Sequence, residues 1–293
     1  MFKHASHGAL IRPLGTFSRK EKGNPFLFVF LFLSILISSP ACSWNALGHR
    51  LITQIAYDNL TRHEKSILNK YNRAVDDKFS NSLVNASIWL DTIRYRTHAY
   101  DEMHYIDIPF STDGTALLKK KKKNAVTAID HSIQILRSPK INNRTKGIAL
   151  RILIHVVGDI HQPLHTATRV SRLYPEGDKG GNLVVLHKNK VANNLHAYWD
   201  KGAGLWIGKR RYGVAWVKKR SIEIETRWPC NVQLTDEKAY DWAKESHDIA
   251  RNGIYGKMVN DSYQFTARKI VEQRVALAGC RLAAVLHGVS GRL

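Results

Sequence analysis

A histidine and an aspartate stand four residues apart inside the apolar stretch LRILIHVVGDI, residues 150–160. A spacing of four places His155 and Asp159 on one face of a helix. Burying an ionisable carboxylate among apolar side chains is costly unless a partner compensates its charge. Taken alone, the pair predicts either a structural ion pair or a metal site, and both alternatives remain open.

Further histidines and aspartates occur in similar settings. His196 and Asp200 repeat the four-residue spacing, and His165 follows Pro163, a residue type that ends helices. Three more candidates lie upstream, at His49, Asp91 and His104. Each alone is ordinarily a satisfied core or surface residue. Together, five histidines and three aspartates suit mixed nitrogen and oxygen ligation, which favours zinc, and their number predicts two or three ions because one tetrahedral zinc takes four ligands.

The apolar pattern predicts an all-α fold. Helical periodicity covers residues 50–60, 81–93, 124–136, 145–160 and 262–287, and a capping box at Thr61 and Glu64 starts another helix. The one strand signal, Leu183 to Leu186 with a turn at Asn189-Lys190, predicts a short β-hairpin. No internal repeat or interior linker is visible. We therefore expect a single compact multi-helix domain with one short hairpin.

The N-terminal 43 residues have the pattern of a signal peptide with an extended basic region. A basic stretch precedes the apolar run from Phe26 to Ile37, whose 12 residues are too few to span a membrane, and small residues follow it. Cleavage after Ser43 would leave Trp44 as the new N-terminus. A lipoprotein with Cys42 lipidated is the weaker alternative, because the usual upstream leucine is missing. The pattern predicts a secreted or periplasmic protein without a membrane anchor after cleavage.

The remaining cysteines, Cys230 and Cys280, are either one disulfide in an oxidising compartment or two free thiols.

The formal net charge is +21, and it falls to +17 without residues 1–43, which hold five basic residues and one acidic residue. Such a charge predicts attraction to polyanions but does not report on the fold. Lys119 to Lys123 is an uninterrupted lysine run. A solvated loop is the favoured interpretation of this run, and a phosphate-binding patch is the alternative.

Six ordered motifs make the chain resemble the zinc-dependent, single-strand-specific S1/P1 nuclease family over nearly the whole of residues 44–293. They are Trp44 with Gly48-His49, Trp89-Leu90-Asp91-x-Ile93-Arg94, His104-Tyr105-Ile106-Asp107, His155-x-x-Gly158-Asp159-Ile160-His161-Gln162-Pro163-Leu164-His165, Asp178-x-Gly180-Gly181-Asn182, and Asn194-Leu195-His196-x-x-Trp199-Asp200. The resemblance implies the three-zinc helical fold that this family shares with the zinc phospholipases C.

The resemblance also implies nine metal-ligand positions. One zinc would be held by Asp91, His104, His155 and Asp159; a second by the α-amine and carbonyl of Trp44, by His49 and by a bridging Asp159; a third by His165, His196 and Asp200. The paired ions would activate a shared water and the third would stabilise the departing 3′ oxygen, giving 5′-phosphate products. Asp91 and Asp159 are thus also implied as catalytic. Because an α-amine at Trp44 exists only after cleavage, processing and activity would be coupled.

Substrate residues follow from the same resemblance. Arg94 would neutralise charge on the phosphate, and Tyr105 and Asp107 would form a base pocket that favours unstacked bases. Asn182 would line the cleft, whereas His161 and Trp199 would pack behind the ligands. The expected partners are single-stranded DNA and RNA and 3′-nucleotides, and the protein is expected to be a monomer.

Two other functions remain open at this stage. A zinc phospholipase C would share the ligands, although the base-pocket motif and the charge favour a nuclease. An exported zinc-storage protein would also need the ligands, but it would not need Arg94, Tyr105 or a bridging Asp159. The fungal and plant family members carry more cysteines, and Ala125 stands where many relatives have one, which indicates a leaner, bacterial-like member.

Overall fold

The computed structural model describes residues 44–119, 121–207, 212–230 and 238–290, so the expected signal peptide lies outside the described residues. Helices dominate, and the all-α expectation is confirmed. The α-helices are α1 (Ala46–Asp58), α2 (Arg62–Arg73), α3 (Leu83–Ala86), α4 (Trp89–Ile93), α5 (Ala125–Arg137), α6 (Asn143–Ile160), α7 (Leu195–Asp200), α8 (Val214–Arg227), α9 (Ala239–Ile249) and α10 (Asp261–Ser290). Short 3₁₀ turns are η1 (Asp101–His104), η2 (Pro163–His165) and η3 (Gly202–Gly204), and the π-helical turn η5 (Ala250–Ile254) follows α9.

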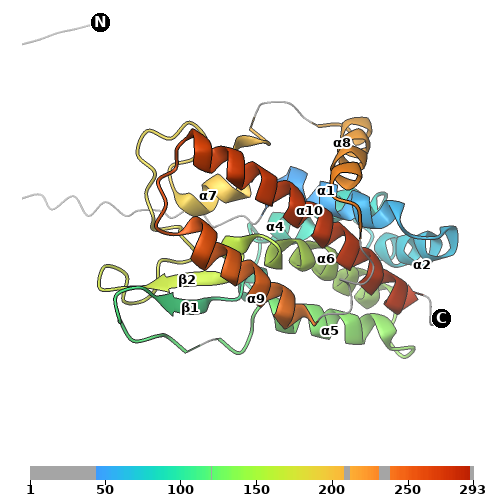
Figure 1. Ribbon diagram of the computed structural model, residues 1–293. Coiled ribbons are helices and arrows are strands. Elements are labelled where there is room, and N and C mark those ends of the chain that lie inside the picture. Colours follow the sequence, from blue (N-terminus) through green and yellow to red (C-terminus); the bar gives the residue numbers. More distant parts are fainter. Residues whose placement is uncertain (1–43, 120, 208–211, 231–237, 291–293) are drawn as a thin grey trace, which may run out of the picture. The chain divides into compact units, whose positions relative to one another are not determined.

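Helix α6 lies at the centre of the core. Every residue from Ala149 to Ile160 is buried, because α1, α2, α5 and α10 all pack against this helix. Figure 1 shows α10 crossing in front of α6, with α5 beside it. An α6 that is covered on all sides explains why its sequence is apolar almost throughout, and it places any polar side chain of its last turns inside the protein.

The prediction of one continuous helix over residues 81–93 is wrong, because the segment forms two short helices. Helix α3 ends at Ala86 and α4 begins at Trp89. Between them, the Ser87 carbonyl accepts a hydrogen bond from His155 Nδ1 at 2.6 Å. The break therefore gives His155 a backbone partner.

The capping box of α2 forms as predicted, with Thr61 and Glu64 bonded reciprocally.

The expected hairpin is present in a minimal form: Val185 and Asn194 make one antiparallel bridge, and the N–H groups of Leu186 and Leu195 donate to the carbonyls of Asn193 and Val184. In addition, β1 (Ile108–Ser111) and β2 (Ala167–Val170) pair in parallel, with Ile108 opposite Ala167. These strands escape a sequence-based search because each has four residues and β1 contains Pro109, which lacks a backbone donor.

The parallel pair aligns two segments that carry predicted ligands. Ile106 donates its N–H to the His165 carbonyl at 2.8 Å, and Ile108 donates to Thr166. Figure 1 shows β1 and β2 side by side at the end of this helical unit away from α2. As a result, the His104–Asp107 motif lies against the segment that follows α6.

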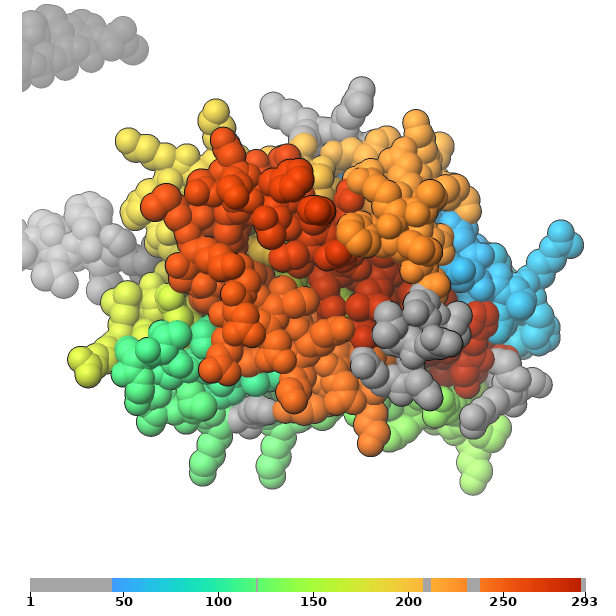
Figure 2. All heavy atoms as spheres, in the orientation of Figure 1, coloured from blue at the N-terminus to red at the C-terminus, as the bar shows by residue number. Residues whose placement is uncertain are grey.

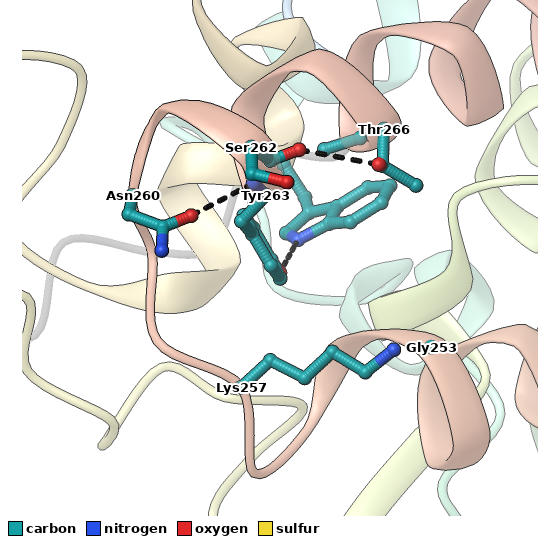
Figure 3. A pocket seen from close by; sticks show the side chains of 8 residues that line it. Gly253, Lys257, Asn260, Ser262, Tyr263 and Thr266 are labelled. Carbon is teal, nitrogen blue, oxygen red and sulfur yellow. Dashed lines mark hydrogen bonds between the residues drawn. The ribbon is translucent and has the colours of Figure 1, made fainter.

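Helix α7 is fixed from behind by α10. The buried indole of Trp199 donates to the Tyr263 hydroxyl at 2.9 Å, a contact visible in Figure 3. A cavity of about 250 Å³ lies beside this contact, near Lys257 and Asn260. On the face shown in Figure 2, α9 and α10 form much of the central surface. Trp199 thus packs behind the ligand positions, as predicted, and holds α7 in place.

A disulfide joins Cys230 to Cys280 of α10, which settles the alternative left open by the sequence. In the described part of the chain, none of the helices combines the length and apolar character needed to span a bilayer.

The packing of α6 on α2 predicts a site that does not tolerate a methyl group. A Cβ at Gly147 would lie 2.2 Å from the Tyr71 carbonyl oxygen. Gly147→Ala should therefore destabilise the protein by about 1–3 kcal/mol, even though alanine favours helices. Urea unfolding measures the change. Gly253→Ala, where a Cβ meets nothing within 4 Å, is the control and should be neutral or stabilise the protein by up to about 1 kcal/mol. Equal effects of the two substitutions would contradict the packing argument.

Candidate metal centre

Eight side chains predicted as ligands gather into three groups. The groups are His49, His155 and Asp159; Asp91, His104 and His155; and His165, His196 and Asp200, and within each group the ligand atoms lie within 4.8 Å of one another. They come from α1, α4, η1, α6, η2 and α7. All are buried except Asp91, which is partly exposed.

Backbone carbonyls fix the orientation of three histidines. His155 Nδ1 donates to Ser87 O at 2.6 Å, His165 Nδ1 to His104 O at 2.6 Å, and His196 Nδ1 to Gly180 O at 2.7 Å. A carbonyl can only accept, so Nδ1 carries the proton in each ring. In the neutral rings, Nε2 then presents a lone pair to the site, as metal-ligating histidines do.

His155 Nε2 can accept a hydrogen bond from His104 Nδ1, which lies 3.2 Å away. The lone pairs of His165 Nε2 and His196 Nε2, by contrast, face each other at 3.1 Å. Acceptor atoms at such distances repel unless a cation, either a proton or a metal ion, lies between them. Because carboxylates of Asp91, Asp159 and Asp200 complete the groups, the donor set fits zinc.

Asp159 faces two sets of histidines with its two oxygens. Oδ1 lies 3.3 Å from His49 Nε2, while Oδ2 lies 3.1 Å from His104 Nδ1 and 3.4 Å from His155 Nε2. The rings of His49 and His155 stack with their centroids 3.8 Å apart. One carboxylate is thereby shared between neighbouring groups, an arrangement suited to a bridging ligand.

The electrostatics favour neutral imidazoles beside an ionised carboxylate. Burial lowers the pKa of His49, His104 and His196 below the usual histidine value. Burial would raise the pKa of Asp159, but contacts with His155, His104 and His49 hold this pKa below its usual value. These are the protonation states that metal ligands need.

His165 behaves differently from the other histidines. Burial opposes its protonation, but the carboxylate of Asp200, 3.7 Å from His165 Nε2, and the charge of Asp159 raise its pKa to about 9. A metal ion bound by His165 and Asp200 would take the place of this proton.

Trp44 lies buried beside the third group. The N–H of Asn45 donates to the Asp200 carbonyl at 2.9 Å, and the Trp44 indole packs edge-on against Trp206 with centroids 5.3 Å apart. A Cβ at Gly48 would lie 2.7 Å from Trp44 Cβ, so Gly48 is what lets α1 approach this residue closely. The start of the described chain is thus tied to the ligand segments.

Two supporting residues lie in the motifs but have functions that sequence reasoning missed. Gln162, fully buried, donates to Asp200 Oδ1 at 2.7 Å and accepts from Leu164 N–H at 2.6 Å. Gly180 has a φ of +63°, and a Cβ there would lie 2.4 Å from the Leu164 carbonyl oxygen. The signal for Gln162 was its place directly between two ligand positions.

His161 lies behind the ligands, as predicted. Its Nδ1 donates to Val157 O at 2.7 Å, and Arg281 donates to Nε2 at 3.1 Å. Burial, together with the charges of Arg274 and Arg281, lowers its pKa well below the usual value. A neutral His161 therefore fixes the chain where it leaves α6.

The predicted substrate residues surround this centre in different ways. Arg94 is partly buried and pairs through Nε with Asp101 at 3.1 Å. Tyr105 and Asp107 lie directly before β1, and burial raises the pKa of Asp107 to about 6, against the opposing charge of Lys121. Asn182 donates to Lys179 O at 2.8 Å within the turn that carries Gly180.

Three groups of histidine and aspartate side chains that could hold metal ions, inside an all-α domain, fit a metal-dependent hydrolase. The family model described as S1/P1 Nuclease matches residues 44–290, so the chain belongs to the S1/P1 nuclease family. The chain is 27% identical to Endonuclease 2 of Arabidopsis thaliana, covering 92% of this chain and 99% of that protein. It is 28% identical to Endonuclease 1 of the same plant (90% and 92% covered) and 23% identical to Nuclease S1 of Aspergillus oryzae (92% and 99%). The protein is therefore a nuclease, a hydrolase that acts on nucleic acid.

Gln162 provides a test of the metal centre that leaves every ligand in place. Gln162→Leu removes the hydrogen bond that orients Asp200, so we expect roughly 10–100-fold weaker metal binding at one site. Metal content is measured by mass spectrometry after titration with a chelator.

The matched control is Gln54→Leu, which also breaks a glutamine–aspartate hydrogen bond, the one to Asp58 on α1. This control should retain all its metal. Equal metal retention in both variants would argue against the assigned role of Gln162.

Proposed function

We propose that this nuclease is an exported trinuclear-zinc endonuclease that hydrolyses single-stranded DNA and RNA to 5′-phosphate products and also removes phosphate from 3′-nucleotides. The observation that carries the proposal is that eight candidate ligand side chains, seven of them buried, gather into three groups in a chain of the S1/P1 nuclease family. In this proposal Trp44 contributes its α-amine and carbonyl as the ninth ligand position.

Zinc ions held there would supply a water of lowered pKa and positive charge for the departing 3′ oxygen. Asp159 orients two neighbouring ligand groups, since its oxygens face His49 on one side and His104 with His155 on the other. Asp91 lies at the exposed side of its group and therefore borders the substrate.

Arg94 is proposed to bind the scissile phosphate. Its Nε pairs with Asp101, and the planar guanidinium has further N–H donors in a fork that matches phosphate oxygens. The ion pair with Asp101 thus orients the side chain.

Tyr105 and Asp107 are proposed to bind a base, the tyrosine by stacking and the carboxylate by accepting hydrogen bonds from the base edge, with Asn182 lining the cleft. Stacking on Tyr105 requires a base that is free of its neighbours, which favours single strands over duplexes. At neutral pH, above the Asp107 pKa of about 6, the carboxylate is ionised and able to accept.

The alternatives considered from the sequence now carry less weight. The family and the relatives are nucleases by name, which argues against a phospholipase C. A storage protein would need neither the Arg94–Asp101 pair nor a tyrosine beside the ligands. A cleavable signal peptide over residues 1–43, with secreted or periplasmic location and a monomeric state, completes the proposal, and the Cys230–Cys280 disulfide supports an oxidising compartment.

A substrate panel tests this function. We expect the purified protein to cleave single-stranded DNA, RNA and 3′-mononucleotides, to leave phosphatidylcholine intact, and to lose activity with a chelator and regain it with zinc. Products are identified by chromatography. Cleavage that persists without zinc, or that acts only on the lipid, would refute the proposal.

The ninth ligand position predicts dependence on N-terminal processing. One additional residue before Trp44 would replace the α-amine by an amide and should reduce activity by at least about 100-fold, with loss of about one zinc per chain. Activity and metal content are compared with protein that begins at Trp44. Trp44→Phe in the correctly processed protein is the control for side-chain packing and should keep its zinc. A fully active extended protein would exclude the α-amine as a ligand.

A further inference from the structure

The connection between β1 and α5 returns directly to the proposed base pocket. Ala125, the first residue of α5, donates its N–H to the Tyr105 carbonyl at 3.0 Å. In Figure 1 this connection leaves the end of β1 and runs back to α5. The lysines that immediately precede α5 are therefore held close to Tyr105.

Asn124 fixes the backbone of these lysines. Its side-chain amide donates to the carbonyls of Lys121 at 3.1 Å and Lys122 at 3.4 Å, while its Oδ1 accepts from the N–H groups of Val126 and Thr127. The end of the lysine run is thus part of the cap of α5.

Lys121 reaches the base pocket itself. Its Nζ lies 3.3 Å from the Tyr105 hydroxyl and 5.5 Å from the centre of the ring, and it pairs with Glu102 at 3.3 Å. Its charge also acts on Asp107. Lys121 therefore lies at the boundary between the pocket and the surface.

Lys122 and Lys123 add two positive charges next to Lys121. Both are exposed, and within the described residues neither has an acidic partner, so Glu102 offsets only one of three adjacent positive charges. We refer to Lys121, Lys122 and Lys123 as the lysine rim. Three neighbouring ammonium groups repel one another, and a polyanion relieves this repulsion.

We propose that the lysine rim binds the phosphates of a nucleic-acid strand beyond the nucleotide whose base lies on Tyr105. This inference rests on the proposed function, because it takes the Tyr105 pocket as a base site. The backbone of the same strand is the polyanion that an occupied pocket would bring to the rim. The enzyme would then bind long single strands more tightly than dinucleotides, with a salt dependence that short substrates lack.

The test compares a single strand of about 20 nucleotides with a dinucleotide. The discriminating variant is Lys122→Gln with Lys123→Gln, which leaves Lys121 and its contact with Tyr105 intact. For the long strand at low salt we expect KM to rise about 3–10-fold and the slope of log affinity against log salt to fall by about 1.4, the value for two lost phosphate contacts on a single strand. The ratio of long-strand to dinucleotide kcat/KM should fall by a similar factor.

The control removes the same charge elsewhere. Lys70→Gln with Lys140→Gln changes two exposed lysines, one on α2 and one after the far end of α5, and should leave this ratio unchanged. A rim variant with the parent's ratio and salt slope would overturn the proposal, as would an equal loss in the control.

A binding measurement separates this proposal from the proposed function. Fluorescence anisotropy of a labelled single strand, with the zinc-loaded protein kept in a non-cleavable phosphorothioate complex, reports on the rim without turnover. If the unsubstituted protein cleaves neither substrate, the proposed function fails. Weaker and less salt-dependent strand binding by the rim variant would even then support the proposal that the lysine rim binds phosphates. If the unsubstituted protein cleaves both substrates and the rim variant binds the strand equally well, only the proposal about the lysine rim is refuted.

Discussion

The structure depends on one electrostatic constraint, the convergence of buried lone pairs at the end of α6. His165 Nε2 and His196 Nε2, 3.1 Å apart beside the carboxylate of Asp200, can coexist in this buried site only with a proton or a metal ion between them. Unfolding would separate these groups and hydrate them. Binding of metal ions is therefore expected to be coupled to folding of the segments that supply the ligands.

Much of the surrounding fold holds the candidate ligands in orientation. The break between α3 and α4 offers the Ser87 carbonyl to His155, the turn containing Gly180 offers a carbonyl to His196, and His104 offers its own to His165. Each histidine is thus fixed by main chain from another part of the sequence. Backbone partners are harder to lose by mutation than side chains, which suits a site assembled from six separate elements.

The candidate ligands can be predicted from the sequence because they are ionisable residues within apolar helical segments. A carboxylate such as Asp159 in an apolar helix demands a partner, and the four-residue spacing of His155–Asp159 and His196–Asp200 identifies two pairs without any structural information. The parallel pair of β1 and β2 was not predictable in this way, since strands of four residues leave little periodic signal. Gln162 and Ser87 were missed for a related reason: their roles depend on partners 38 and 68 residues away. The ends of α3 and α4 were missed because tertiary hydrogen bonding overrides local helix propensity there.

The positive charge of the chain acts on a different length scale from the metal centre. Exposed lysines act over about 8–10 Å at physiological salt, so they attract a polyanion without selecting it. Selection requires contacts that a duplex or a lipid cannot make, and Tyr105 with Asp107 supplies them in our proposal. Lys121 links the long-range attraction to the short-range contacts. Its ammonium group donates to the Tyr105 hydroxyl, while its neighbours Lys122 and Lys123 are exposed. In our proposal, a strand attracted by the positive charge therefore meets Tyr105 first, so that attraction and selection act on the same strand.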